Sequence, residues 1–322
     1  PGAFKTRGSR VGDSMSQRRF TAELERVNGR LSALVRAYRE TRLGKYGLLA
    51  PTLAFVAVVM AFPTAILVSY SFNPYDAGTV GVGVTLAHYV RAFTTPLYQQ
   101  TLFRTVWIAA AVTAIDFVLG FPLAYAAVRK GGWVGKLIVI ATLAPLTIDL
   151  VVRSFGWFIL LNGSGVINST LVTLGIVSAE NTPKLLFNEV GIVIGLAHVM
   201  LPFMVFPIIN VLHTIPHELE EAARSLGANR ATTFTRVLVP LALPGISAGV
   251  LITFVVSLAS YVTPALLGGG VRVIPVVITE TFTSTSNWPF ASALSMILVA
   301  VALVVIVGYQ RVLSRLDGVG GV

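Results

Sequence analysis

Six long apolar stretches restrict the folds open to this sequence more than any other feature. They lie at 46–72, 104–128, 136–161, 190–212, 245–267 and 289–313. Each one reaches or exceeds the ~20 residues that a helix needs to cross a hydrocarbon core of ~30 Å. Lipid offers no hydrogen bonds to the backbone, so each stretch must satisfy its own peptide groups, which favours α-helices. A membrane β-barrel would show short segments of alternating polarity instead. The sequence therefore predicts an all-α membrane protein with six transmembrane helices.

Composition agrees with this class and excludes several others. Hydrophobic residues make up 55% of the chain and charged residues 12%, with a mean hydropathy of +0.79. Soluble domains carry about 25% charged residues. Cysteine is absent, which removes disulfides, thiolate chemistry and cysteine-ligated metals. No nucleophile–base pair or metal-ligand cluster stands out, so we expect neither an enzyme nor a cofactor or metal site.

The distribution of Lys and Arg predicts the orientation. If the N-terminus is cytoplasmic, 19 of the 24 Lys and Arg residues fall on the cytoplasmic side. By the positive-inside rule, both termini are then expected in the cytoplasm. The net charge of +10 fits attraction to anionic lipid headgroups. We do not expect nucleic acid as a partner, because no basic patch is interleaved with an aromatic platform.

This orientation predicts three parts. Residues 1–45 form a basic cytoplasmic arm, 46–313 a transmembrane domain and 314–322 a cytoplasmic tail. Within the arm, apolar residues at helical spacing over 15–42 predict a helix lying on the membrane surface. The alternative is that this helix contacts the ATPase.

A polar segment, 213–244, separates the fourth and fifth apolar stretches and is too charged to lie in lipid. Pro216 suits the first turn of a short helix, and the glutamates that follow favour the positive end of its dipole. Ala222 and Ala223 allow close approach to a groove on a partner. Gly227 is placed to end the helix in a left-handed conformation. The alternative is an amphipathic loop resting on the bilayer, which the alanine pair and the helix-ending glycine disfavour.

The spacing within this segment resembles the cytoplasmic docking loop of binding-protein-dependent ABC transporter permeases. That pattern is Glu-Ala-Ala, three residues, Gly, nine residues, then Ile-x-Leu-Pro. The matching residues are Glu221, Ala222, Ala223 and Gly227, with Val237 and Val239 as the two aliphatic residues before Pro240. The resemblance implies docking onto an ATPase through Glu220, Glu221, Ala222, Ala223, Leu226 and Gly227.

Further similarity extends over 46–313 and is strongest to the first permease subunit of spermidine/putrescine-type importers. The segments that carry it are Gly120-Phe121-Pro122-Leu123-Ala124-Tyr125, Ala144-Pro145-Leu146, Arg153-Ser154-Phe155-Gly156-Trp157, Leu201-Pro202-Phe203-Met204, Tyr261-Val262-Thr263-Pro264-Ala265-Leu266-Leu267-Gly268-Gly269 and Trp288-Pro289. The resemblance implies a type I ABC importer permease fold in a bacterial inner membrane, and transport by alternating access.

The resemblance also implies partners. The sequence contains no Gly-x4-Gly-Lys-Ser/Thr phosphate-binding loop, so ATP hydrolysis must come from another polypeptide. We expect an ATP-binding cassette ATPase dimer, a second homologous permease subunit and an extracytoplasmic solute-binding protein. The runner-up interpretation is a self-contained secondary transporter driven by an ion gradient.

The expected solute is a polyamine such as spermidine or putrescine, although the same branch includes carriers of opines, phosphonates and amino-acid-like solutes. One departure bears on this expectation. Ser260 stands before Tyr261, where many polyamine-type members carry an acidic residue. A cation in a low-dielectric path needs carboxylate partners, and intramembrane charges are costly unless they have a role. The candidate pathway residues are Asp116, Asp149, Trp157, Tyr261 and Glu280.

Each candidate also has a structural alternative. Asp116 either faces the pathway or bonds another helix. Asp149 and Arg153 are four residues apart and can pair on one helix face. Trp157 and Tyr261 can offer cation–π surfaces, but such residues more often anchor a helix at the membrane interface.

Overall fold

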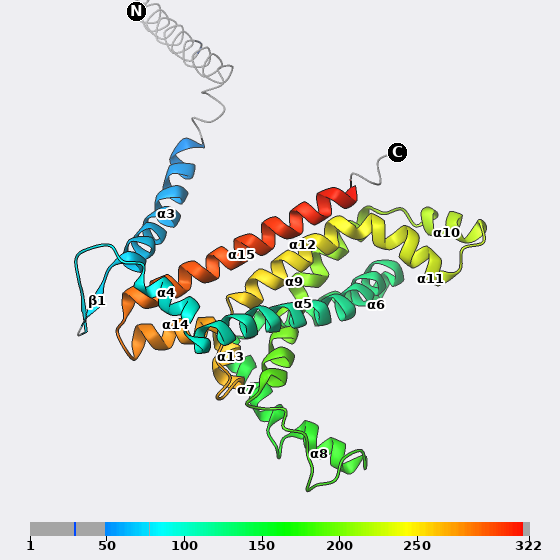
Figure 1. The fold of residues 1–322 in the computed structure, drawn as a ribbon. Coiled ribbons are helices and arrows are strands. Elements are labelled where there is room, and N and C mark those ends of the chain that lie inside the picture. The colour runs from blue at the N-terminus through cyan, green and yellow to red at the C-terminus, as the bar shows by residue number, and fades with distance from the viewer. Residues whose placement is uncertain (1–28, 30–48, 77, 318–322) are drawn as a thin grey trace, which may run out of the picture. The chain divides into compact units, whose positions relative to one another are not determined.

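The computed structural model describes residue 29, residues 49–76 and residues 78–317 (Figure 1). The chain divides into two compact units, residues 1–66 and residues 67–322. Apart from residue 29, the expected arm at 1–45 and its surface helix lie outside the described residues, as does the tail beyond 317.

Within the described residues, six helical stretches are long and apolar enough to cross a membrane, as the sequence predicts. They are Ala50–Phe72, Pro96–Lys130, Leu150–Thr173, Glu189–Thr214, Arg230–Leu258 and Trp288–Arg315. The first is α3 (Ala50–Phe72), which crosses the boundary between the two units and contains no charged residue.

The predicted third helix, 136–161, is not continuous. The segment forms α6 (Gly132–Thr147) and α7 (Leu150–Leu161), and α8 (Val166–Thr173) follows. Ile148 between α6 and α7 is extended, and the Asp149 carboxylate accepts hydrogen bonds from the backbone N–H groups of Val151 (2.9 Å) and Val152 (3.2 Å). An aspartate side chain that caps a new helix competes with continuation of the previous one.

The predicted fifth helix, 245–267, begins earlier and is also interrupted. It comprises α11 (Arg230–Thr233), the π-helical turn η1 (Phe234–Leu238), α12 (Val239–Leu258) and, after a break, α13 (Val262–Leu267). Pro240 has no N–H for the carbonyl four residues before it. The wider π turn, in which the Val239 N–H bonds the Phe234 carbonyl, accommodates this gap without ending the helix.

Three helices form the centre of the bundle: α5 (Pro96–Lys130), α9 (Glu189–Thr214) and α12 each pack against the other two. Met204 of α9 is fully buried between Gly120 of α5 and Gly249 of α12. A Cβ added to Gly249 would lie 2.9 Å from the Met204 carbonyl oxygen. The two backbones can therefore approach closely only because small residues lie at the contact.

The two ends of this bundle are different (Figure 1). At one end lie α4 (Ala87–Thr94) and α14 (Ile274–Thr283), which pack against α15 (Trp288–Asp317). A short antiparallel hairpin, β1 (Tyr75–Asp76) with β2 (Thr79–Val80), precedes α4. At the other end lie α10 (Glu218–Ser225) and α11, within the predicted docking segment.

Candidate functional site

The short helix α10 forms within the predicted docking segment, but it begins at Glu218, so Pro216 precedes the helix instead of lying in its first turn. Its first turn carries three glutamates, which favour the positive end of the helix dipole. At its other end Gly227 has φ +89°. The N–H of Gly227 bonds the Arg224 carbonyl, and the N–H of Ala228 bonds the Ala223 carbonyl. This pair of bonds is a Schellman motif, which satisfies carbonyls left free at the helix end.

The accessible surface of α10 contains most of the residues predicted for docking. Leu226 is 89% exposed and Leu219 is 43% exposed. Glu221, Ala222 and Gly227 are also exposed, and Ala223 is half-buried. We call Leu219, Glu221, Ala222, Leu226 and Gly227 the α10 face.

Glu220 differs from the rest of the predicted set because its side chain is only 1% exposed and so lies outside the α10 face. Its Oε1 lies 2.6 Å from Arg129 Nε. Its Oε2 accepts a hydrogen bond from the Tyr125 hydroxyl at 3.0 Å and lies 3.8 Å from Arg224 Nη2. A buried carboxylate is tolerated when it is paired in this way.

Arg129 links three helices. It lies in the last turn of α5, and its Nη1 and Nη2 both donate to the Ile215 carbonyl at 3.2 Å. Ile215 is the residue that ends α9, where carbonyls lack partners within the helix. The same guanidinium holds Glu220 of α10. Sequence reasoning missed Tyr125 and Arg129; the available signal was their four-residue spacing on one face at the end of an apolar stretch.

Three of the predicted pathway residues lie on two short helices that pack together, α7 and α13. Ser154 Oγ and Thr263 Oγ1, 3.2 Å apart, join these helices. Asp149 is exposed at the start of α7, and Tyr261 is exposed at the start of α13. Trp157 is half-buried and donates from Nε1 to His198 Nδ1 of α9 at 3.1 Å.

The possible pair between Asp149 and Arg153 is replaced by other bonds. Asp149 caps α7, and the Arg153 guanidinium donates to the Pro145 carbonyl. No ion pair between these two side chains is present among the described residues.

Asp116 is fully buried in α5, and neither of its carboxyl oxygens has a hydrogen-bond partner. Thr253 Oγ1 of α12 is also buried without a partner. Gly120 of α5 and Gly249 of α12 both lie against Met204. One turn farther from α10, α5 carries Asp116 and α12 carries Thr253. Because α5 and α12 are antiparallel, these two polar groups lie at the same level of the bundle.

Two acids near the opposite end of the bundle, Glu280 and Glu189, form ion pairs. Glu280 of α14 lies 3.9 Å from Arg272, with both side chains half-exposed, and α14 packs mainly against α15. Glu189, at the start of α9, binds Arg104 of α5 with 2.7 Å between Oε1 and Nε. The sequence did not indicate the latter pair, because Glu189 lies just outside the predicted apolar stretch.

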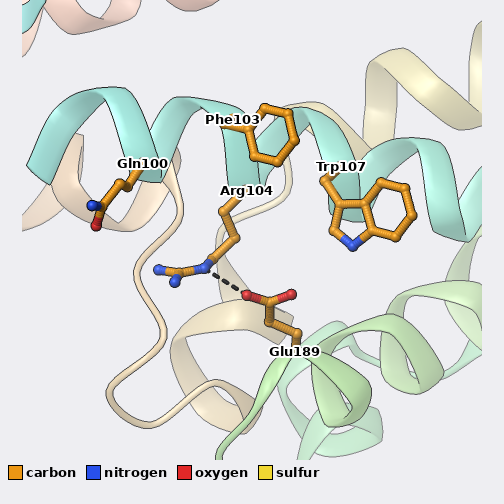
Figure 2. Close-up of a pocket in the computed structure, with 5 residues that line it drawn as sticks. All are labelled: Gln100, Phe103, Arg104, Trp107 and Glu189. Carbon is orange, nitrogen blue, oxygen red and sulfur yellow. Dashed lines mark hydrogen bonds and ion pairs between the residues drawn. The ribbon is translucent and has the colours of Figure 1, made fainter. Parts of the chain in front are cut away.

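The Arg104–Glu189 pair borders a hollow of about 480 Å³. Its lining residues are Gln100, Phe103, Arg104, Trp107 and Glu189. Figure 2 shows Arg104, from α5, pointing toward Glu189. Within the described residues no group of three or more His, Asp or Glu could hold a metal ion.

Comparisons with known proteins identify the family to which this membrane protein belongs. Residues 116–317 match the family described as binding-protein-dependent transport system inner membrane component. The spermidine/putrescine transport system permease protein PotB of Haemophilus influenzae is 31% identical over 258 residues, which cover 79% of this chain and 89% of that protein. PotB of Escherichia coli is 31% identical over 265 residues, covering 81% of this chain and 94% of that protein.

A solved structure shares the fold. The crystal structure of a bacterial alginate ABC transporter in complex with alginate pentasaccharide-bound periplasmic protein contains a chain with a TM-score of 0.61 and 19% identity. The match covers 84% of this chain and 94% of that chain.

This chain therefore belongs to the binding-protein-dependent transport system inner membrane component family. It is a multi-pass inner-membrane protein and the permease subunit of an ABC importer. Permeases of this kind are non-catalytic, and a partner ATPase hydrolyses ATP.

Proposed function

We propose that this chain moves a polyamine such as spermidine or putrescine into the cytoplasm by ATP-driven alternating access, and that α10 docks onto an ATPase dimer. The observation that carries the docking proposal is the α10 face, an exposed set of apolar and small residues together with Glu221. The assignment of Leu226 and its neighbours to ATPase binding follows from this exposure together with family membership.

The physical case for docking rests on what exposure costs. Apolar surface left in water is unfavourable by roughly 25 cal/mol per Å², and Leu226 is almost fully exposed in the isolated chain. A short helix that presents such residues fits a groove on a partner. Closure of the ATPase dimer on ATP would draw two such helices together and open the pathway outward. Hydrolysis would then reset it inward.

The remaining partners follow from this role. A second homologous permease would supply the other docking helix, and an extracytoplasmic binding protein would deliver the solute. Both termini would be cytoplasmic, with 1–45 as a basic arm, 46–313 as the transmembrane domain and 314–322 as a tail. Lipid surrounds this domain, and we propose no role for nucleic acid.

The similarity to PotB supports a polyamine as the solute. Asp149, Trp157 and Tyr261 on α7 and α13 are the pathway residues that we favour, because the two interrupted helices pack together. Half-helix ends at breaks of this kind are common binding positions in transporters. Asp116 would contact the solute only after the bundle rearranges, and Glu280 would contact it near the entrance of the pathway. Ser260, just before α13, stands where many polyamine-type permeases carry an acid. Asp149, just before α7, is therefore the exposed carboxylate that these two helices offer to the solute.

The test is ATP hydrolysis and uptake by the assembled complex in proteoliposomes. Spermidine-loaded binding protein should stimulate both activities, and the permease without its ATPase should transport nothing. Stimulation by a phosphonate, an opine or an amino acid instead would overturn the polyamine assignment alone. Uptake by this chain without an ATPase, driven by an ion gradient, would overturn the importer mechanism.

A further inference from the structure

The helix α10 has few direct connections to the centre of the bundle. Among the described residues it packs mainly against α11 and η1. Its link to α9 is the short connection after Ile215, and its link to α5 consists of the Glu220 carboxylate. A docking helix attached only by its ends would move without displacing α5.

The Glu220 carboxylate supplies a direct connection between α10 and α5. Tyr125 and Arg129 lie one turn apart on α5 and hold its two oxygens separately, with Oε2 at 3.0 Å from the hydroxyl and Oε1 at 2.6 Å from Nε. Arg129 simultaneously holds the carbonyl that ends α9. We call Tyr125, Arg129, Glu220 and the Ile215 carbonyl the Arg129 clamp.

The surroundings of the clamp favour a rigid connection. Phe234 of η1 packs edge-to-face on Phe121 (5.0 Å between ring centroids) and on Tyr125 (6.4 Å) of α5. Ile215 and Leu238 belong to the same buried apolar cluster. The Tyr125 hydroxyl donates a hydrogen bond to Glu220 Oε2, whereas Arg129 Nε and Glu220 Oε1 form a close ion pair without hydrogen-bond geometry. Separating two buried opposite charges is costly, so a displacement of α10 must move α5 and α9 with it.

We propose that Glu220 is a positioning residue that couples α10 to α5 and α9 through the Arg129 clamp, and that it makes no contact with the partner ATPase. This inference rests on the proposed docking of α10. Buried ion pairs contribute little net stability compared with apolar replacements. The clamp therefore matters for how motion is transmitted between the docking helix and the bundle.

The first experiment uses the chain alone, so that it does not depend on docking. The sequence has no cysteine, and spin labels at Leu226→Cys and Lys130→Cys would report the position of α10 relative to the end of α5. The clamp predicts a narrow distance distribution that Glu220→Gln broadens. The matched control is Glu221→Gln, because the Glu221 side chain is 67% exposed and its ion-pair partner is His217. Equal distributions in the two variants would overturn the proposal.

The second experiment uses the complex with its cognate ATPase in proteoliposomes and measures solute moved per ATP hydrolysed. Glu220→Gln should retain the ATPase but lower this ratio about tenfold, within the usual range of coupling between sites. Tyr125→Phe removes one bond of the clamp and should lower the ratio less. The reversed pair Glu220→Arg with Arg129→Glu should restore part of it.

The outcomes separate the clamp from docking. An unchanged ratio in both Glu220→Gln and Tyr125→Phe would overturn the clamp, while docking would stand. If Glu220→Gln releases the ATPase, the Tyr125→Phe ratio decides, and a wild-type ratio there contradicts the proposal. If the wild-type chain binds no ATPase, the docking proposal fails, and the spin-label distances still test the clamp as a rigid connection.

Discussion

Two fully buried acids in this protein have opposite surroundings. Glu220, on the buried side of α10, accepts a hydrogen bond from Tyr125 and forms ion pairs with Arg129 and Arg224. Asp116, in the centre of the bundle, has no hydrogen-bond partner for either oxygen. Both are 0% exposed, so burial alone does not distinguish their roles.

The difference suggests that Glu220 connects parts of the structure, whereas Asp116 gains a partner only in another conformation of the bundle. A buried charge that is paired holds its elements in one arrangement, and removing its partner is costly. A buried acid without a partner is unfavourable where it lies, and such groups within membranes commonly have functional roles. We therefore expect perturbation at Glu220 to affect the fold and coupling, and perturbation at Asp116 to affect transport.

The largest effect on the free energy of unfolding is expected at the ion pair between Arg129 and Glu220. Arg129→Met leaves the buried Glu220 carboxylate without its nearest positive charge, and should lower the free energy of unfolding by about 3–5 kcal/mol. Adding Glu220→Met should recover most of that loss, because two apolar residues replace the pair. Unfolding in mixed micelles measures both changes. A double variant as unstable as Arg129→Met would show that the ion pair is not the source of the effect.

The next effect concerns the end of α10. Gly227 has φ +89°, and Gly227→Val should cost about 1–3 kcal/mol of local strain, disorder the α10 face and abolish uptake. Gly227→Asn is the matched control, since asparagine tolerates this conformation better than other non-glycine residues. Retention of the ATPase on a column reports the result. Equal retention by the two variants would argue against a need for this helix end.

A smaller effect is expected at the break before α7. Asp149→Ala removes a helix cap and should cost about 1 kcal/mol of stability. Asp149→Asn keeps a capping oxygen but removes the charge. If Asp149 contacts a cationic solute, spermidine uptake should fall in both variants while stability falls only in the first. Normal uptake by Asp149→Asn would restrict the residue to capping.

The smallest effect on stability is expected at the unpaired acid. Asp116→Asn should change the free energy of unfolding by less than about 1 kcal/mol, because no hydrogen bond is lost. Uptake should nevertheless fall. A loss of stability as large as that of Arg129→Met would mean that Asp116 is paired, and the contrast with Glu220 would disappear.

The same contrast marks how far the sequence could predict the molecule. Six spans were predictable because their length and composition leave lipid as the only suitable solvent. The breaks at Ile148 and at 259–261 were not, since an apolar stretch looks the same whether one helix or two cover it. The sequence allows Asp149 either to contact the solute or to pair with Arg153, and it does not indicate that the carboxylate caps α7.

In the candidate site, local features were predictable from the sequence, whereas contacts between distant residues were not. Local features of α10 were predictable because helix-end signals depend on neighbouring residues, and Gly227 adopts the expected conformation. The burial of Glu220 was not, because its partner Tyr125 is 95 residues away. The burial of Asp116 depends on how closely α5, α9 and α12 approach, which the spacing of small residues only suggests.

Docking through α10 can be tested by site-specific photo-crosslinking at Leu226. Leu226→Cys would be the only cysteine in this chain and can carry a photo-crosslinker in membranes that contain the whole importer. If α10 docks onto the ATPase, Leu226→Cys forms a crosslink to the nucleotide-hydrolysing subunit, with a yield that changes when ATP binds. Crosslinks solely to lipid or to this chain itself would contradict it.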